Sequence, residues 1–202
     1  MRANEGAYRS LPWLLLLWPA LAAAHVGHGA AGDGGLLSGL LHPVTGLDHV
    51  VAMIAVGLWG AQLGAPALWV LPIAFPLVMA MGAVLGVTGV PIPFVESGIA
   101  ASGIVLGLMV AFAVRPPLWL AFLIVACFAV FHGHAHGAEL PAYGVPILYA
   151  TGFVVATGLL HLTGIGIGAT RRWPAGEWLV RAGGVLVALV GAWYLFVPLL
   201  PG

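Results

Sequence analysis

The sequence contains no lysine and a single cysteine, and these two scarcities exclude several classes of protein. Without lysine, the chain has neither the P-loop lysine of a Walker-type ATPase nor a residue that forms Schiff bases. With Cys127 alone, it has no internal disulfide and no multi-cysteine zinc site. Polar chemistry therefore falls to eight histidines and six acidic residues, a balance that favours metal binding.

Charge is equally scarce. Only 6% of the 202 residues are charged and 62% are hydrophobic, whereas a soluble domain carries roughly 25% charged residues. Twelve charges cannot cover the surface of a water-soluble globule of this size, and the mean hydropathy is +1.11. We therefore expect an integral membrane protein. The formal net charge of zero gives no reason to expect a nucleic-acid partner.

The first 24 residues have the pattern of a secretory signal peptide. Arg2 and Arg9 precede a short apolar core, and small residues end at Ala24, where we expect cleavage. Residues 25–35 would then form a periplasmic tail. In that tail the new α-amine, His25 and His28 are candidate metal ligands, and the alternative is a flexible, solvated tail.

Residues 36–202 predict a transport domain, a compact all-α bundle of six membrane-spanning helices with its N-terminus outside. Apolar runs place the spans near 36–62, 66–88, 94–114, 117–138, 143–167 and 176–198. In this orientation the four arginines that follow the signal lie on the inner side, as the positive-inside rule requires: Arg115, Arg171, Arg172 and Arg181. Paired glycines predict close helix contacts at Gly60/Gly64, Gly82/Gly86, Gly103/Gly107 and Gly133/Gly137.

Ionisable residues inside the predicted spans are costly and therefore point to function. The first span carries His42, Asp48 and His49, which together offer part of a nitrogen and oxygen coordination shell. Met53 follows one turn after His49 on the same face. Pro43 disfavours helix at His42, so the geometry there is expected to be irregular. The alternative is that Asp48 only orients a packed histidine at a helix N-terminus.

A second cluster ends the fourth span. His132 and His136 are spaced i, i+4 and Glu139 follows three residues later, so the three share a face if the helix persists, whereas His134 points nearly opposite. An i, i+4 histidine pair can chelate one ion, and the alternative is a solvated histidine-rich loop.

The predicted topology brings both clusters to the same outer depth. Glu96, near the outer start of the third span, is either a further ligand or a first-turn acid favoured by the helix dipole. His161 lies deeper, in the inner half of the fifth span. It is either an exit-side ligand or a histidine packed against a carbonyl group.

The two clusters lie within longer motifs that resemble those of the HupE/UreJ family of nickel/cobalt permeases. The first runs His42-Pro43-x-x-Gly46-x-Asp48-His49-x-x-x-Met53-x-x-Val56-Gly57-x-Trp59-x-x-Gln62, and the second runs Phe131-His132-Gly133-x-Ala135-His136-Gly137-x-Glu139. The resemblance covers the chain from the signal onward and implies transport roles for His42, Asp48, His49, His136 and Glu139. Glu96 and Phe75 match family positions less closely. Five residues separate His42 from Asp48, unlike the His-x4-Asp-His box of better-known nickel/cobalt transporters.

This resemblance implies a multi-pass bacterial inner-membrane permease that imports Ni²⁺ or Co²⁺ from the periplasm by secondary or facilitated transport. Its expected partners are the ion, the lipid bilayer and the maturation proteins of hydrogenase or urease, with no permanently bound cofactor. The main alternative is an intramembrane metal-dependent hydrolase that uses His132, His136 and Glu139. A bis-histidine haem carrier and a metal chaperone are further alternatives.

Overall fold

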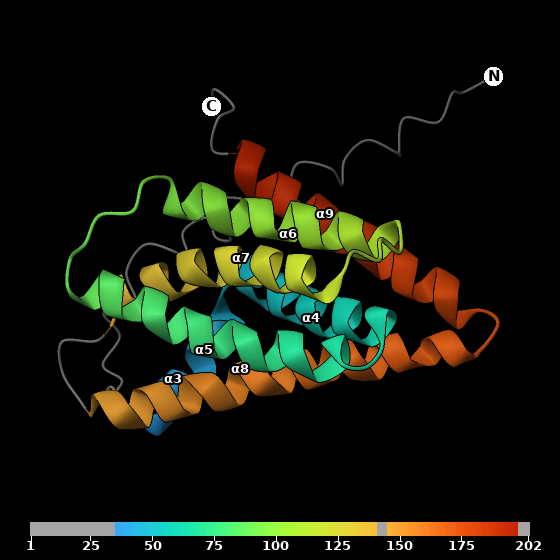
Figure 1. The fold of residues 1–202 in the computed structure, drawn as a ribbon. Coiled ribbons are helices and arrows are strands. Elements are labelled where there is room, and N and C mark those ends of the chain that lie inside the picture. Colours follow the sequence, from blue (N-terminus) through green and yellow to red (C-terminus); the bar gives the residue numbers. More distant parts are fainter. Residues whose placement is uncertain (1–34, 141–144, 198–202) are drawn as a thin grey trace, which may run out of the picture. The chain divides into compact units, whose positions relative to one another are not determined.

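The computed structural model describes residues 35–140 and 145–197, and every regular element in these ranges is a helix (Figure 1). The prediction of an all-α chain is thus confirmed for the described residues. The proposed signal peptide and both tail histidines, His25 and His28, lie outside them. With the labels of Figure 1, the helices are α3 (Leu36–Thr45), α4 (Leu47–Leu63), α5 (Ala67–Val87), α6 (Val95–Ala111), α7 (Leu118–Ala138), α8 (Pro146–Gly168), the 3₁₀ helix η2 (Ala169–Arg172) and α9 (Gly176–Phe196).

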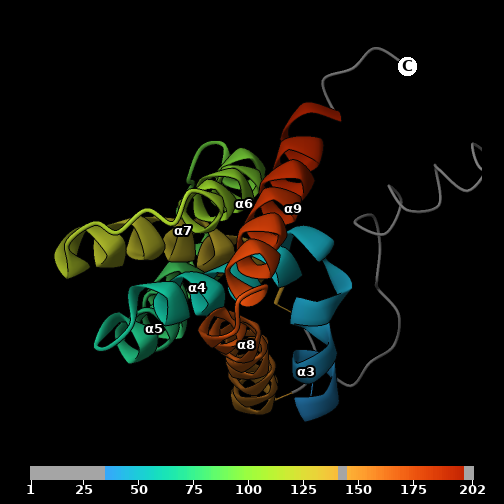
Figure 2. The same ribbon diagram turned by 90° about the vertical axis from the view of Figure 1, so that its right-hand side faces the viewer.

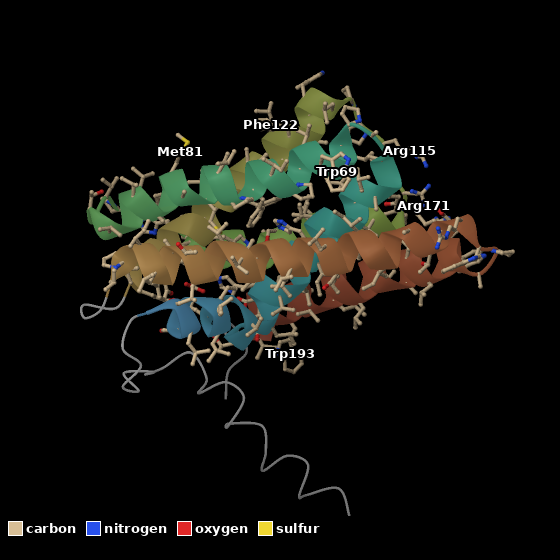
Figure 3. All side chains as sticks on the ribbon, turned by 90° about the horizontal axis from the view of Figure 1, so that it is seen from below. Trp69, Met81, Arg115, Phe122, Arg171 and Trp193 are labelled. Atoms are coloured by element: carbon tan, nitrogen blue, oxygen red, sulfur yellow. The ribbon has the colours of Figure 1, made fainter. Side chains whose placement is uncertain are left out.

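Four of these helices, α5, α7, α8 and α9, are long and apolar enough to cross a membrane. The pair α3 and α4 passes the same test when taken together, and α6 is a shorter apolar helix of 17 residues. Large apolar side chains such as Trp69 and Met81 point outward, with 55% and 68% of their surface exposed (Figure 3). Such a surface suits contact with lipid rather than water.

The first predicted span is not one continuous helix. Helices α3 and α4 meet at an angle of 88°, and Gly46 between them has an extended backbone with φ −100° and ψ 115°. Contrary to the expectation from Pro43, the helix continues through His42 and Pro43 and breaks three residues later. A Cβ atom at Gly46 would lie 3.0 Å from both Asp48 Oδ1 and His49 Nδ1, so glycine lets these side chains fold against the break.

Helix α4 forms the centre of the described bundle, with α5, α6, α8 and α9 around it (Figure 2). Eleven of its side chains or glycines are buried, and they lie on all sides of the helix. A helix that is buried all round belongs to a core. Any polar side chain on α4 is therefore held inside the protein and away from lipid.

Glycines bring the helices together in pairs. A side chain at Gly82 or Gly133, where α5 packs on α7, would place its Cβ atom against the backbone of the partner helix. The same holds at Gly107, where α6 packs on α9. These contacts confirm the packing role predicted for the glycine pairs of α5, α6 and α7. Gly57 and Gly164 join α4 to α8 in the same way. Gly64, in contrast, faces open space and ends α4 with φ 82°.

The arginines gather where α4, α6 and α8 end. Arg115 and Arg171 lie at the same end of the bundle (Figure 3). Arg171 Nη1 donates hydrogen bonds to the carbonyl oxygens of Ala61 and Gln62, at 3.1 and 2.8 Å. Arg181 Nε donates to Ala111 O at 2.8 Å. These contacts satisfy carbonyl groups that the last turns of α4 and α6 leave free.

Candidate metal site

The two predicted clusters meet inside the bundle. The break at Gly46 holds His42 at the end of α3 and His49 at the start of α4, while α7 presents His132 and His136 on one face. The described residues form two overlapping groups whose candidate ligand atoms lie within 4.8 Å of one another in each group.

The first group, the buried triad, consists of His49, His132 and His136. Its three side chains are 6%, 0% and 6% exposed, respectively. The ring centroid of His49 lies 4.9 Å from that of His132 and 4.5 Å from that of His136. His49 Nε2, His132 Nδ1 and His136 Nε2 have no hydrogen-bond partner among the described residues. Buried polar atoms are normally bonded, so three such nitrogens in one place make this group a candidate metal site.

The opposite nitrogen of each ring is contacted by a neighbouring side chain, which is Asp48 for His49, Ser102 for His132 and His42 for His136. Asp48 Oδ1 lies 3.0 Å from His49 Nδ1 and also accepts the backbone N–H of His49 at 3.0 Å. A carboxylate next to Nδ1 fixes the proton there and leaves the Nε2 lone pair for metal. The Asp48 carboxylate interacts electrostatically with Tyr194 of α9. The Tyr194 hydroxyl also forms a hydrogen bond with the backbone of Leu47.

His132 is oriented by Ser102 of α6. The Ser102 hydroxyl donates its one hydrogen to Ile99 O at 2.6 Å, and its oxygen lies 3.0 Å from His132 Nε2. Because that hydrogen is already used, Ser102 Oγ accepts from His132 Nε2–H. The lone pair of His132 is therefore on Nδ1, the atom that has no partner in the described chain.

The second group, the outer group, consists of His42, His136 and Glu139. His42 Nε2 lies 3.0 Å from His136 Nδ1 and 3.4 Å from Glu139 Oε2. The side chains of His42 and Glu139 are 27% and 54% exposed, so this group is accessible at the surface. His136 belongs to both groups, with Nδ1 in the outer group and Nε2 on the side of the buried triad.

These distances suit a small divalent transition-metal ion. Bonds of about 2.1 Å to nitrogen or oxygen separate neighbouring ligands of an octahedral ion by about 3 Å. The atoms of the outer group already lie 3.0 and 3.4 Å apart. Imidazole nitrogen with carboxylate oxygen is a donor set of intermediate softness, which Ni²⁺, Co²⁺ and Zn²⁺ accept.

The remaining predicted residues lie in three different environments. Glu96 is exposed in the first turn of α6, outside both groups. Met53 is fully buried in the core one turn beyond His49. The Phe75 ring contacts both His132 and His161, with ring centroids 5.4 Å apart in each case. His134 points away from the site, as its position on the helix predicts, and hydrogen-bonds Val90 O at 2.8 Å.

The structure distributes the three residues proposed for the hydrolase alternative over the two groups. His132 belongs to the buried triad, whereas Glu139 belongs to the outer group, and only His136 is common to both. Glu139 therefore shares a group with His136 but not with His49 and His132.

Sequence reasoning missed Ser102 and Tyr194. Neither residue lies in a motif, because each acts from a helix whose sequence carries no further polar pattern. Their roles come from the register of α6 against α7 and of α9 against α4, which only the packed structure provides.

Comparison with known proteins identifies the family of this chain. The family described as "HupE / UreJ protein" matches residues 13–194. The chain is also 48% identical over 177 residues to Protein HupE of Rhizobium leguminosarum bv. viciae, an alignment that covers 88% of this chain and 91% of that protein. No solved structure matches. The resemblance seen in the two histidine motifs is thus confirmed over nearly the whole sequence, and the chain belongs to the HupE/UreJ family.

Proposed function

We propose that this protein is a permease that carries Ni²⁺ or Co²⁺ across the bacterial inner membrane from the periplasm, for use in hydrogenase or urease maturation. The observation that carries the proposal is the buried triad, in which three imidazole nitrogens without partners meet inside an apolar bundle. Ionisable groups at such a position are expensive unless they serve function.

The two groups give the ion a route inward. The outer group, with its exposed glutamate, receives the hydrated ion, and the carboxylate offsets part of its charge. His136 first binds the ion through Nδ1, with its ring proton on Nε2. For the ion to move to the Nε2 side, where His49 and His132 complete the coordination, that proton must transfer to Nδ1, where His42 Nε2 lies 3.0 Å away and can accept its hydrogen bond. An inside-negative potential favours this direction by about 4.6 kcal/mol for a divalent ion at 100 mV.

The membrane arrangement belongs to the same proposal. Six spans, with α3 and α4 forming a broken first span, place the outer group near the periplasmic face and the arginines inside. Helices that are broken at the substrate site are common in secondary transporters, because the break frees backbone and side chains to face the ion. The tail that carries His25 and His28 would collect ions on the periplasmic side after signal cleavage.

Uptake by proteoliposomes tests the function. Purified protein is reconstituted, and accumulation of ⁶³Ni²⁺ is measured with an inside-negative potential for the wild type, His136→Ala and the matched control His134→Ala. We expect uptake by the wild type and the control, and at least a ten-fold loss for His136→Ala. A wild type that transports neither ion, or a His136→Ala variant with normal uptake, would overturn the proposal.

A further inference from the structure

Beyond the buried triad, α8 carries two buried polar side chains whose hydrogen bonding is incomplete. His161 is 1% exposed and Thr157 is 0% exposed. Neither ring nitrogen of His161, nor Thr157 Oγ1, makes a hydrogen bond of good geometry within the described chain. The two residues are one turn apart on the same face of α8, so their polar atoms point into the same part of the bundle. A buried histidine whose ring nitrogens lack well-formed hydrogen bonds is costly to keep unless something binds it.

A single aromatic ring contacts both this location and the buried triad. The ring centroid of Phe75 in α5 lies 5.4 Å from that of His132 and 5.4 Å from that of His161. Phe75 is fully buried, so an apolar ring connects the two locations. His161 lies deeper than the triad, because its carbonyl contacts Gly57 of α4. Gly57 is roughly 12 Å further along that helix than His49, at about 1.5 Å per residue.

The prolines around Phe75 supply an oxygen donor. Pro76 has no N–H, so it cannot bond the carbonyl of Pro72 one turn earlier, and that carbonyl has no helical partner. The backbone of Pro72 interacts with His161. A carbonyl oxygen of α5 without a helical partner therefore lies beside His161.

From these contacts we propose that His161, Thr157 Oγ1 and the Pro72 carbonyl form a second, weaker binding site for the transported ion, which it reaches by passing Phe75. This inference rests on the proposed function. One imidazole with two neutral oxygens suits the same ions as the triad but holds them less tightly, because it has fewer nitrogens and no carboxylate. A weaker site nearer the arginine end favours release, since conduction requires that the last site lets the ion leave.

Separate measurements of binding and transport test this site. Equilibrium binding of Ni²⁺ to detergent-solubilised full-length protein reports on the triad, and ⁶³Ni²⁺ uptake by proteoliposomes reports on the complete path. We expect His161→Leu to bind Ni²⁺ within about two-fold of the wild type and to lose at least ten-fold in uptake rate. His49→Ala should lose both. Leucine fits the apolar surroundings and removes both ring nitrogens.

Thr157→Val provides a second variant that keeps the shape of the side chain and deletes only the hydroxyl. We expect it to retain Ni²⁺ binding and to slow uptake several-fold, so the inference stays testable if His161→Leu does not fold. Wild-type uptake rates in both variants would overturn the second site and leave the proposed function standing. Loss of Ni²⁺ binding in a folded His161→Leu protein would also overturn it, because His161 would then belong to the triad. Failure of the wild type to transport would instead overturn the proposed function.

Discussion

Each histidine of the buried triad depends on the group that holds its other nitrogen. Asp48 bonds His49 at Nδ1, Ser102 accepts from His132 at Nε2, and His42 lies against His136 at Nδ1. Groups of this kind fix the tautomer and the orientation of a metal-binding ring. Asp48 contacts His49 as the interpretation of an orienting carboxylate predicts, and the ligand role of the cluster stays a prediction.

Replacing Ser102 tests this dependence. In Ser102→Ala the Nε2–H of His132 loses its acceptor in a buried place, so the ring can turn and its lone pair no longer faces the triad. We expect Ni²⁺ binding to weaken by roughly 10- to 100-fold, measured by titration calorimetry, with little change in thermal stability. Ser97→Ala, an exposed position on the same helix, is the control. Wild-type affinity in Ser102→Ala would remove Ser102 from the site.

At the level of helices, glycine decides how closely the elements approach. Gly164 of α8 lies against Ile54 O of α4, whereas Gly166, two residues later, faces open space. Alanine at the first position forces backbone atoms apart, and such overpacking costs about 1–3 kcal/mol. Alanine at the second position only improves helix propensity, by about 1 kcal/mol at most.

We therefore expect Gly164→Ala to lower the melting temperature of the detergent-solubilised protein by several degrees, and Gly166→Ala to leave it unchanged or slightly raised. Fluorescence-detected size-exclusion chromatography after heating measures both. Equal stability of the two variants would contradict the packing of α4 on α8 at this point.

Element positions were predictable because long apolar runs and arginine-containing connections mark them. The predicted span 117–138 matches α7, Leu118–Ala138, almost residue by residue. The break at Gly46 was not predictable in detail. Pro43 gives the stronger local signal, yet the helix tolerates it, and the turn forms where a glycine can accept the folded-back Asp48 and His49.

On the scale of the whole chain, the helix pairs follow a regular pattern. Helix α4 packs with α8, α5 with α7, and α6 with α9. Exchanging the first three proposed spans with the last three converts the α4–α8 and α5–α7 pairs into each other and the α6–α9 pair into itself. Such an exchange is the pattern of an inverted repeat. Only α4 departs from it, because it also packs on α5 and α6 while α7 has no comparable contact with α8 or α9.

The proposed orientation is testable with single cysteines in a Cys127→Ser background. Pro91 and Pro174 are exposed in connections at opposite ends of the helices. A membrane-impermeant maleimide should label Pro91→Cys in intact spheroplasts, and Pro174→Cys only after permeabilisation. The reverse result would place the arginines outside and the outer group at the cytoplasmic face.

The central claim is that nitrogens of His49, His132 and His136 bind the transported ion together. X-ray absorption spectroscopy of Ni²⁺ bound to the purified protein tests it directly. The account predicts nitrogen and oxygen neighbours at about 2.1 Å, with imidazole scattering that decreases when any one of the three histidines is replaced by alanine and is unchanged in His134→Ala. An imidazole signal that is the same in the wild type and in all three triad variants would contradict it.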